Sequence, residues 1–335
     1  MDPDIDLQVF AMMSELLPDD MDGVVAITVT HHPDLDVLAR QMRSLPCGCR
    51  RMVVDNASSD AVCMELERWA ADGHDARFLQ NGTNLGLPAA INKGVAAAFV
   101  TWPDLRFVLL LDQDSEPTQG AVARLVAAAK ALAEAGHAVG TVGPALVEAK
   151  TGARHGFHQM TRFMWKRVDP QADSLPIPTA NLNGSGSLIP VAVFERLGGL
   201  DASLFIDHVD TDWAFRVQAA GYGLWGVPAS IFLHSMGERV LTFGSRRRRP
   251  WPIRTPARHF FLFRNAVILM RRPSVPRTWK IWAVGKLALT MLAHLILDRR
   301  RLQQISRMLA GILEGMTTRL HGAKPVDNAP QKDRA

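Results

Sequence analysis

Two aspartates separated by one glutamine follow an apolar run in the stretch VLLLDQDSEP, residues 108–117. Continuous apolar residues at 108–111 are typical of a strand that is buried on both faces. Carboxylates this close repel each other, so Asp112 and Asp114 require either a bound cation or a solvated turn. Their hard oxygen atoms suit Mg²⁺ or Mn²⁺, which take their remaining ligands from substrate phosphates. The alternative is a turn in which Asp114 or Ser115 caps the next helix, and the buried strand in front favours the metal.

A second group of acids lies in the stretch SLFIDHVDTDWAFR, residues 203–216. One of Asp207, Asp210 and Asp212 is a candidate general base, because crowding with the other acids would raise its proton affinity. The alternative is a helix N-cap at or beside Asp210, since acids are favourable at helix starts. Trp213 could pack under a substrate ring, although a tryptophan at such a position is more often part of the core.

His234 follows another apolar run, in the stretch SIFLHSMGE at residues 230–238. As a neutral imidazole it could complete a metal shell, although a single histidine is more often structural. The Gly-rich stretch GSGS at 184–187 is a weak signal for backbone that approaches a ligand. The sequence has no serine or cysteine nucleophile motif and neither GxxxxGK[ST] nor GxGxxG.

Strands that end in polar turns alternate with helices along most of the chain. The predicted strands are 23–33, 50–60, 76–80, 106–115, 138–146 and 230–238, and the predicted helices are 87–99, 118–136, one opened by Pro190, and 212–220. Residues 150–182 are predicted to be irregular. This alternation is typical of a doubly wound, mostly parallel sheet, whose ligands bind beyond the carboxyl ends of the strands. It places His31, Asp55, Asn84 and the Asp112/Asp114 pair around one crevice.

The composition excludes a disordered chain, because 47% of the 335 residues are hydrophobic and 21% are charged. The net charge of +5 is uneven: residues 239–324 hold 19 Lys and Arg against two acids, which leaves about −12 for the remainder. The three cysteines lack CxxC spacing and are expected to remain thiols in a reducing cytosol. The first twenty residues lack a basic start, so no secretory signal is expected.

The basic segments RRRRPWPIR (246–254) and DRRRLQQISR (298–307) bracket an apolar stretch at 279–297. Lys286 and His294 interrupt that stretch, which falls short of the ~20 uninterrupted apolar residues of a spanning helix. We therefore expect an interfacial helix attracted to anionic lipid, at about 1 kcal/mol per basic residue near the surface. The alternative is a buried helix of a C-terminal subdomain. A nucleic-acid partner is not expected, because no recognition motif accompanies the charge.

Six motifs, taken in order, resemble inverting family-2 glycosyltransferases with a GT-A fold: VTHHPD, VVDNASSD, NLGLPAAINKG, LLLDQDS, GGLDASLFIDHVDTDWAFR and HSMG. The pair LLLDQDS and LFIDHVDTDWAFR is similar to the bacterial rhamnosyltransferase branch. The resemblance spans about residues 22–270 and implies an α/β, Rossmann-like, doubly wound, mostly parallel sheet with a helical basic C-terminal region. We expect four segments: an acidic N-terminal leader (1–20), the GT-A domain (21–240), a basic amphipathic helical region (241–322) and a disordered tail (323–335).

The resemblance also implies which acid does the chemistry. Asp210 would be the base that deprotonates the acceptor hydroxyl. Relatives often carry an acidic pair where this chain has Val209 and Asp210, so Asp207 and Asp212 stay open as alternatives.

By the same resemblance, Asp112, Asp114 and His234 would hold a Mg²⁺ or Mn²⁺ ion against the donor diphosphate. Asp55 would hold the base or ribose of the nucleotide, and Asn84 would help to frame that pocket. The residues expected to bind the nucleotide sugar are Thr30, His31, Asp55, Asn84, Gly86, Asn92, Asp112, Gln113 and Trp213.

The expected function is metal-dependent, inverting transfer of L-rhamnose from dTDP-L-rhamnose to a lipid-linked saccharide or glycolipid acceptor. The expected location is cytoplasmic, peripheral at the inner face of the cytoplasmic membrane, and a homo-oligomer is left open. Two alternatives stay open: a family-2 transferase with another donor such as a UDP-hexose, and a non-catalytic membrane-associated adaptor with the same fold.

Overall fold

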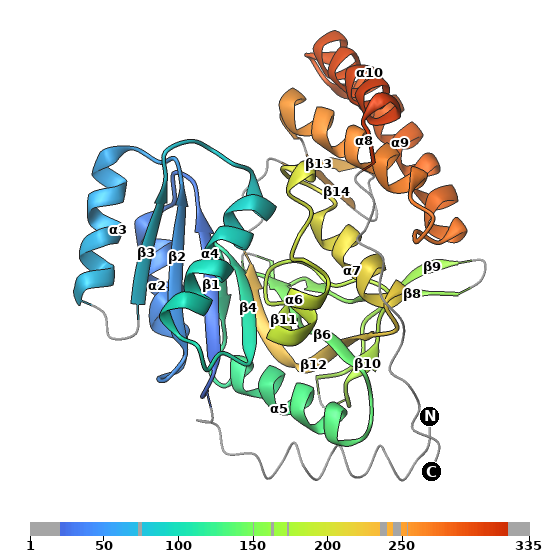
Figure 1. Cartoon of the computed structure of the whole chain (residues 1–335). Helices are drawn as coiled ribbons and strands as arrows, with labels where there is room; N and C mark the ends of the chain where they lie inside the picture. The colour runs from blue at the N-terminus through green and yellow to red at the C-terminus, as the bar shows by residue number, and fades with distance from the viewer. Residues whose placement is uncertain are drawn as a thin grey trace.

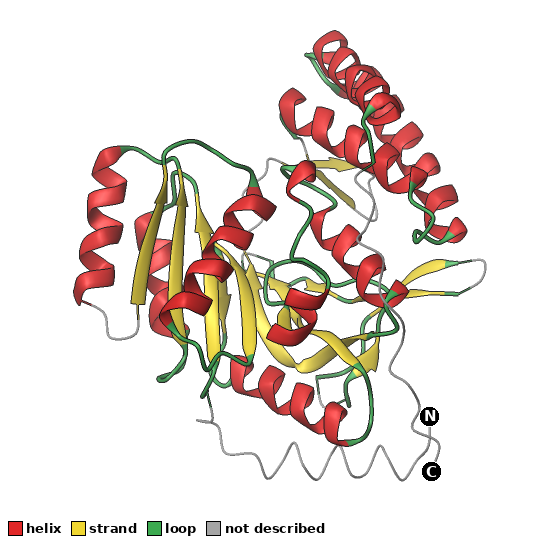
Figure 2. Ribbon diagram, in the orientation of Figure 1, coloured by secondary structure: helices red, strands yellow, loops and turns green. Residues whose placement is uncertain are grey.

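The structure is a computed structural model that describes residues 21–72, 76–149, 151–161, 164–172, 174–234, 240–243, 249–252 and 254–320. The predicted leader and tail, and the residues of HSMG after His234, lie outside the described residues. The described chain forms a central sheet with helices on both faces and a group of helices at its C-terminal end (Figures 1 and 2).

Four parallel strands form the N-terminal half of the sheet. They are β1 (Val24–Thr30), β2 (Arg50–Asn56), β3 (Ala76–Asn81) and β4 (Phe107–Asp112), in the order β4-β1-β2-β3. All seven residues of β1 are buried, because helices cover both faces of the sheet. Pairing of Val29 with Asp112 and of Thr30 with Asp55 aligns the carboxyl ends of these strands at one edge. The predicted parallel sheet is confirmed here.

The other half of the sheet is mixed. Its strands are β5 (Ser115–Pro117), β6 (Val139–Glu148), β7 (Arg154–His155), β10 (Ile177–Pro178), β11 (Leu188–Pro190) and β12 (Gly223–His234). β11 is antiparallel to both β4 and β6, whereas β12 is parallel to β6. β5 runs antiparallel to the end of β12 and pairs Ser115 with His234. This pairing brings His234 beside the DQDS turn, far from it in sequence.

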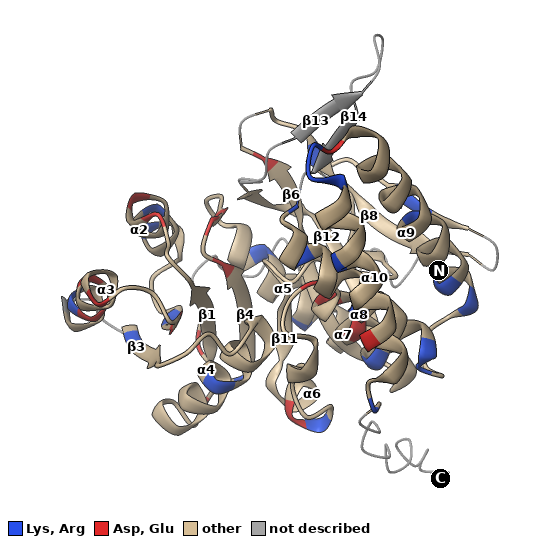
Figure 3. Cartoon of the chain, turned by 90° about the horizontal axis from the view of Figure 1, so that it is seen from above, with Lys and Arg blue, Asp and Glu red and all other residues tan. Residues whose placement is uncertain are grey.

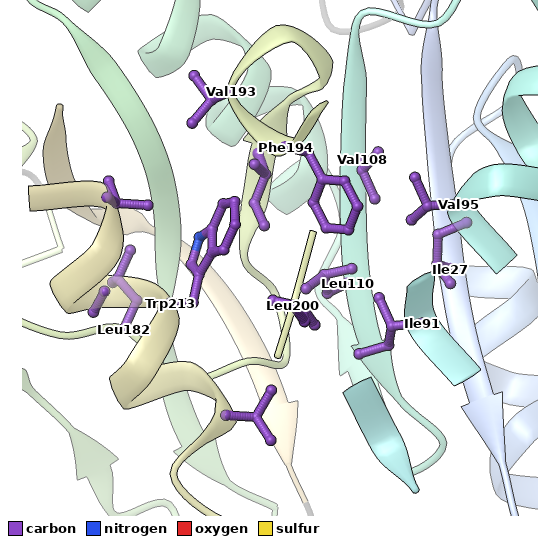
Figure 4. Close-up of a cluster of buried hydrophobic side chains, with 14 of the residues drawn as sticks. Ile27, Ile91, Val95, Val108, Leu110, Leu182, Val193, Phe194, Leu200 and Trp213 are labelled. Carbon is purple, nitrogen blue, oxygen red and sulfur yellow. The ribbon is translucent and has the colours of Figure 1, made fainter. Parts of the chain in front are cut away.

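Helices cover the two faces as a doubly wound sheet requires. One face carries α4 (Leu87–Thr101), α6 (Val191–Arg196) and α7 (Val209–Ala219), and the other carries α2 (Leu35–Ser44), α3 (Asp60–Asp72) and α5 (Ala121–Glu134). Alternate residues of β1 face opposite sides: Ile27 joins the core under α4, and Ala26 joins the core under α5. Figure 4 shows the first core between β1, β4, α4, α6 and α7.

Several element boundaries differ from the sequence predictions. α7 begins at Val209, three residues before the predicted start, and β12 begins at Gly223 rather than at residue 230. Residues 150–182, expected to be irregular, contain the hairpin of β8 (Phe157–Met160) and β9 (Trp165–Val168). α2 and α3 were not predicted.

The C-terminal region is not entirely helical. It begins with the paired strands β13 (Val240–Phe243) and β14 (Arg249–Pro252) and continues with α8 (Pro256–Arg271), α9 (Arg277–Leu297) and α10 (Arg301–Thr317). Trp279 and Ala283 of α9 belong to the same core as Trp213 of α7. The hydrophobic core therefore crosses the boundary predicted at residue 240, and that boundary stays a prediction.

α9 has a second property. Within the described residues it is the one helix long and apolar enough to cross a membrane, judged by length and composition alone. Lys and Arg recur along the C-terminal helices (Figure 3).

Candidate active site

A cavity of about 710 Å³ lies at the edge where the parallel strands end. Its walls come from the ends of β1 and β4, the start of α4, the loop before β11, the segment leading into α7, and helices α8 and α9. Ligands of doubly wound sheets bind at this edge. The cavity is therefore the candidate active site.

The DQDS turn forms one wall of the cavity and is held through its backbone. The side chain of Gln41 is fully buried and donates hydrogen bonds to the carbonyl oxygens of Asp112 (2.5 Å) and Ser115 (2.6 Å). The backbone N–H of Asp112 donates to Ser185 Oγ at 3.1 Å. Ser185 belongs to the GSGS stretch that the sequence marked weakly, whereas Gln41 had no sequence signal beyond being a polar residue in an amphipathic helix.

Asp112, Asp114 and His234 line the cavity together, and one ligand atom from each lies within 4.8 Å of the others. His234 Nδ1 is 3.5 Å from Asp114 Oδ1 and 3.0 Å from Ser115 Oγ. Burial raises the pKa of Asp112 to about 6 and also raises the pKa of Asp114. Two carboxylates and an imidazole suit a divalent cation such as Mg²⁺ or Mn²⁺, whose charge would offset this crowding. These residues therefore fit a metal ion.

Of the three acids in and just before the first turn of α7, Asp210 stands apart. It lines the cavity in the first turn of α7, and burial raises its pKa. Asp207 also lines the cavity but pairs with Arg254 and Arg258. Among the described residues, no cation forms an ion pair with Asp210. Its Oδ1 instead accepts a hydrogen bond from the N–H of the next residue at 2.7 Å.

Asp212 lies outside the cavity lining. It is 1% exposed and pairs with Arg216 at 2.8 Å and with Arg272, the residue that directly follows α8. A carboxylate held by two guanidinium groups and cut off from the cavity is placed to hold α7 and α8 together.

The loop before α7 adopts an uncommon backbone. Phe205, Asp207 and His208 have φ values of +62°, +63° and +61°, in the left-handed region that bulky residues rarely adopt. Such conformations cost of order 1–3 kcal/mol each and persist only where the surroundings fix them. The loop that presents the acids therefore depends on contacts from elsewhere.

Those contacts come from α8. The fully buried side-chain amide of Asn265 donates to the carbonyl oxygens of Leu204 (2.7 Å), Ile206 (2.7 Å) and Asp207 (2.9 Å). Arg264 donates to a fourth carbonyl in the same loop at 2.6 Å. The sequence offered one signal for this role: Asn265 is a polar residue within the apolar run of α8. Arg254, predicted to attract lipid, instead reaches the loop.

Most predicted nucleotide-sugar residues line the cavity, and two do not. Those in the lining are Thr30, His31, Asn84, Gly86, Asp112, Gln113 and Trp213. Asp55 is fully buried, and its carboxylate accepts hydrogen bonds from Thr30 Oγ1 (3.0 Å) and from Ser58 N (2.8 Å) and Oγ (2.5 Å). The side-chain amide of Asn92 forms two hydrogen bonds with the backbone of Leu200. Direct donor contacts by Asp55 and Asn92 stay predictions.

Gly86 meets a requirement that only glycine fulfils at low cost. Its φ is +82°, and a Cβ there would lie 2.6 Å from the ring of Phe205. Its N–H donates to Asn84 Oδ1 at 2.9 Å, which fixes the entry to α4 at the cavity wall. Trp213 is 4% exposed and donates to Thr141 Oγ1 at 3.0 Å, so it is mainly a core residue.

Residues 37–198 match the family model Glycosyl transferase family 2. The chain is 22% identical over 296 residues to dTDP-rhamnosyl transferase RfbF of Shigella flexneri, which covers 88% of this chain and 95% of that protein. It is 26% identical over 248 residues to N-acetylglucosaminyl-diphospho-decaprenol L-rhamnosyltransferase of Mycobacterium tuberculosis, covering 66% of this chain and 76% of that protein.

Solved structures share the fold at low identity. GalNAc-T7 with UDP, GalNAc and Mn²⁺ superposes with a TM-score of 0.53 at 15% identity, over 87% of this chain and 55% of that chain, so this chain spans about half of that structure. The mannosyltransferase PcManGT of Pyrobaculum calidifontis, with GDP-Man and Mn²⁺, gives a TM-score of 0.50 at 15% identity, over 94% of each chain.

The chain shares the GT-A fold with these solved structures. Over residues 37–198 the chain is similar to glycosyltransferase family 2, as its motifs predicted. The prediction of an enzyme is thereby confirmed, in preference to the non-catalytic adaptor.

Proposed function

We propose that the protein transfers L-rhamnose, with inversion, from dTDP-L-rhamnose to a hydroxyl of a lipid-linked saccharide or glycolipid, with Mg²⁺ or Mn²⁺. One observation carries this proposal: the Asp112–Asp114–His234 group lines the same cavity as Asp210, which forms no ion pair with any residue that the structure describes. The two curated relatives named above are both rhamnosyl transferases, which supports rhamnose as the sugar.

The proposed reaction uses two sets of side chains in the cavity, Asp210 and the Asp112–Asp114–His234 group. Asp210 accepts the proton of the acceptor hydroxyl, whose oxygen forms a bond to the anomeric carbon of the donor sugar. The bond from that carbon to the diphosphate oxygen breaks on the opposite side, so the configuration inverts and dTDP leaves. Asp112, Asp114 and His234 would hold the divalent ion, which when bound offsets the charge that develops on the departing diphosphate. Backbone contacts to Gln41 and Ser185 keep these ligands in place.

A donor comparison tests the proposed function. With Mn²⁺ present, dTDP-L-rhamnose is expected to raise the melting temperature by several degrees and to be slowly hydrolysed, because ligands that bind only the folded state stabilise it. UDP-hexoses are expected to do neither. If a UDP-hexose stabilises the protein and is hydrolysed, and dTDP-L-rhamnose does neither, the proposed donor is wrong and a UDP-hexose takes its place.

We also propose that the enzyme is cytoplasmic and binds the inner face of the cytoplasmic membrane through α9. The solvent-facing side of α9 carries an apolar strip of Ile281, Val284, Leu289, Leu292 and Ile296, each 52–75% exposed. Exposed apolar surface of this kind marks an interaction site. Three consecutive arginines follow at residues 299–301. This charge complements anionic lipid and would repel a second copy of the chain, so a bilayer is the occupant that fits.

The double substitution Leu292→Glu/Ile296→Glu is expected to reduce co-sedimentation with phosphatidylglycerol vesicles at least tenfold, because two apolar side chains that would enter the lipid become charged. Val100→Glu, at an apolar residue of α4 that is 87% exposed, is the matched control and should sediment like the unchanged protein. A dimer in the absence of vesicles that the double substitution dissociates would show that the strip binds another copy, and the membrane proposal would be wrong.

A further inference from the structure

Away from the two acidic groups, one part of the cavity has aromatic walls. His158 of β8 stacks on Trp165 of β9 with ring centroids 5.3 Å apart, and Trp165 lies 5.9 Å from Trp282 of α9. All three rings line the same cavity as Asp210. Aromatic surfaces with a few polar groups are typical of sites that hold a small organic ligand.

Two polar atoms of this part lack partners. Trp165 Nε1, a donor, and Asn181 Oδ1, an acceptor, are buried from solvent and form no hydrogen bond in the described part of the chain. Leaving such an atom unsatisfied costs about 1–3 kcal/mol, and buried polar atoms are rarely left so. Both residues line the cavity, so a hydroxylated ligand could supply the missing partners.

A cation completes the arrangement. Lys286 of α9 lines the cavity with its ammonium 4.7 Å from the ring centroid of Trp282. Desolvation of that ammonium, together with the positive charge of Arg254, lowers the pKa of Lys286. Within the described ranges, no carboxylate forms an ion pair with Lys286. The nearby carboxylates of Asp210 and Asp207 act on this ammonium only at longer range. A cation beside aromatic rings that forms no ion pair with a described residue is suited to a phosphate group.

We propose that His158, Trp165, Asn181, Trp282 and Lys286 form the acceptor subsite, and that the acceptor is a saccharide linked to phosphate. The apolar face of the sugar ring packs against the two tryptophans, its hydroxyls pair with Trp165 Nε1 and Asn181 Oδ1, and its phosphate binds Lys286. This inference rests on the proposed function and names the class of acceptor. Trp282 and Lys286 lie on the helix whose other side carries the apolar strip, which suits a phosphate at the head-group level of a membrane.

Binding can be measured without turnover, by titrating tryptophan fluorescence with two probes in EDTA. One probe is N-acetylglucosamine joined to an octyl chain through a phosphate, and the other is the uncharged octyl glycoside. Lys286→Gln is expected to weaken binding of the phosphate probe at least tenfold and to leave the glycoside unchanged, since hydrogen bonds to charged groups are the stronger ones. Trp165→Phe, which keeps a ring but removes Nε1, should weaken both probes several-fold.

Lys166→Gln is the matched control. It makes the same charge change on the hairpin that carries Trp165. Lys166 is exposed, as Lys286 is, but it lies outside the cavity lining, because alternate residues of β9 face opposite sides. Equal loss of both probes in Lys286→Gln, or binding of neither probe at millimolar concentration, would overturn the proposal. Binding should survive in Asp112→Ala/Asp114→Ala, which separates this test from failure of the proposed transfer.

The source of the phosphate is decided by presenting the same head group on a long-chain lipid in phosphatidylcholine vesicles. Tighter binding in vesicles that requires Lys286 supports a lipid-borne acceptor. Equal binding of the soluble and vesicle forms supports a free saccharide phosphate, with the subsite still assigned. If Lys286→Gln leaves binding to the vesicles unchanged, the assignment of Lys286 to the acceptor subsite is wrong.

Discussion

Replacing Asp210 by asparagine is expected to lower kcat by about 10²–10⁴-fold, the usual contribution of a general base, while binding of dTDP-L-rhamnose is kept. The amide is nearly the same size and its Oδ1 can still accept the N–H of Thr211, so the start of α7 keeps its form. The group that accepts the proton is lost. A steady-state assay of transfer measures the loss of kcat, and calorimetric titration with the donor measures whether its affinity is kept.

Asp207→Asn is the control for this prediction. Asp207 pairs with Arg254 and Arg258, so its substitution should lower the melting temperature and disturb the loop before α7. Its effect on transfer is therefore expected to accompany a loss of stability. If Asp207→Asn alone abolishes transfer in a protein of unchanged stability and donor affinity, the base has been assigned to the wrong residue.

Substituting Asp112 and Asp114 together by alanine is expected to reduce transfer at least ~10³-fold, because metal ligands supply several kcal/mol of transition-state stabilisation. The protein should remain folded. Gln41 and Ser185 contact the backbone of this turn rather than the carboxylates, and alanine retains those contacts. Stabilisation by Mn²⁺ plus donor, read as a shift in melting temperature, should disappear.

Glu116→Ala provides a matched loss of one acid close to the same turn. Glu116 forms only an exposed pair with Arg40, at 3.4 Å, and pairs of that kind contribute little to stability. It should keep both transfer and the response to Mn²⁺. Substantial turnover in the double alanine variant would refute the metal site at Asp112 and Asp114.

The parts of the fold that local sequence determines were predicted well. β1 and β4 are buried on both faces, so their apolar runs are continuous and the polar residue after each run marks the strand end. The position of Asp112 at the cavity follows from that rule. α2 and α3 escaped prediction, although α2 is amphipathic and its sequence carries the apolar period that predicts a helix.

The contacts that distinguish the acids from one another could not be predicted. Asp207, Asp210 and Asp212 look alike in sequence, and what separates them are arginines that arrive from α7 and α8. Asp55 is a second example. The sequence predicts a polar residue at that strand end, but it does not predict which groups form hydrogen bonds with its carboxylate. Its carboxylate is satisfied within the protein by Ser58. Pairs of polar groups that are far apart in the chain produce no repeating pattern in the sequence, so pattern analysis cannot predict them.

The hydrogen bonds from Asn265 to the loop at 204–207 have a consequence for exchanging parts between related enzymes. The family match ends at residue 198, so it contains the DQDS turn but neither the loop, nor Asp210, nor α8. Loop and helix must therefore be transplanted as a single module. A chimera that swaps α8–α10 alone would separate Asp207 from Arg258 and Asn265. One joined near residue 198 would move the loop, Asp210 and α8 together, but it would leave His158, Trp165 and Asn181 of the proposed acceptor subsite on the other side of the join.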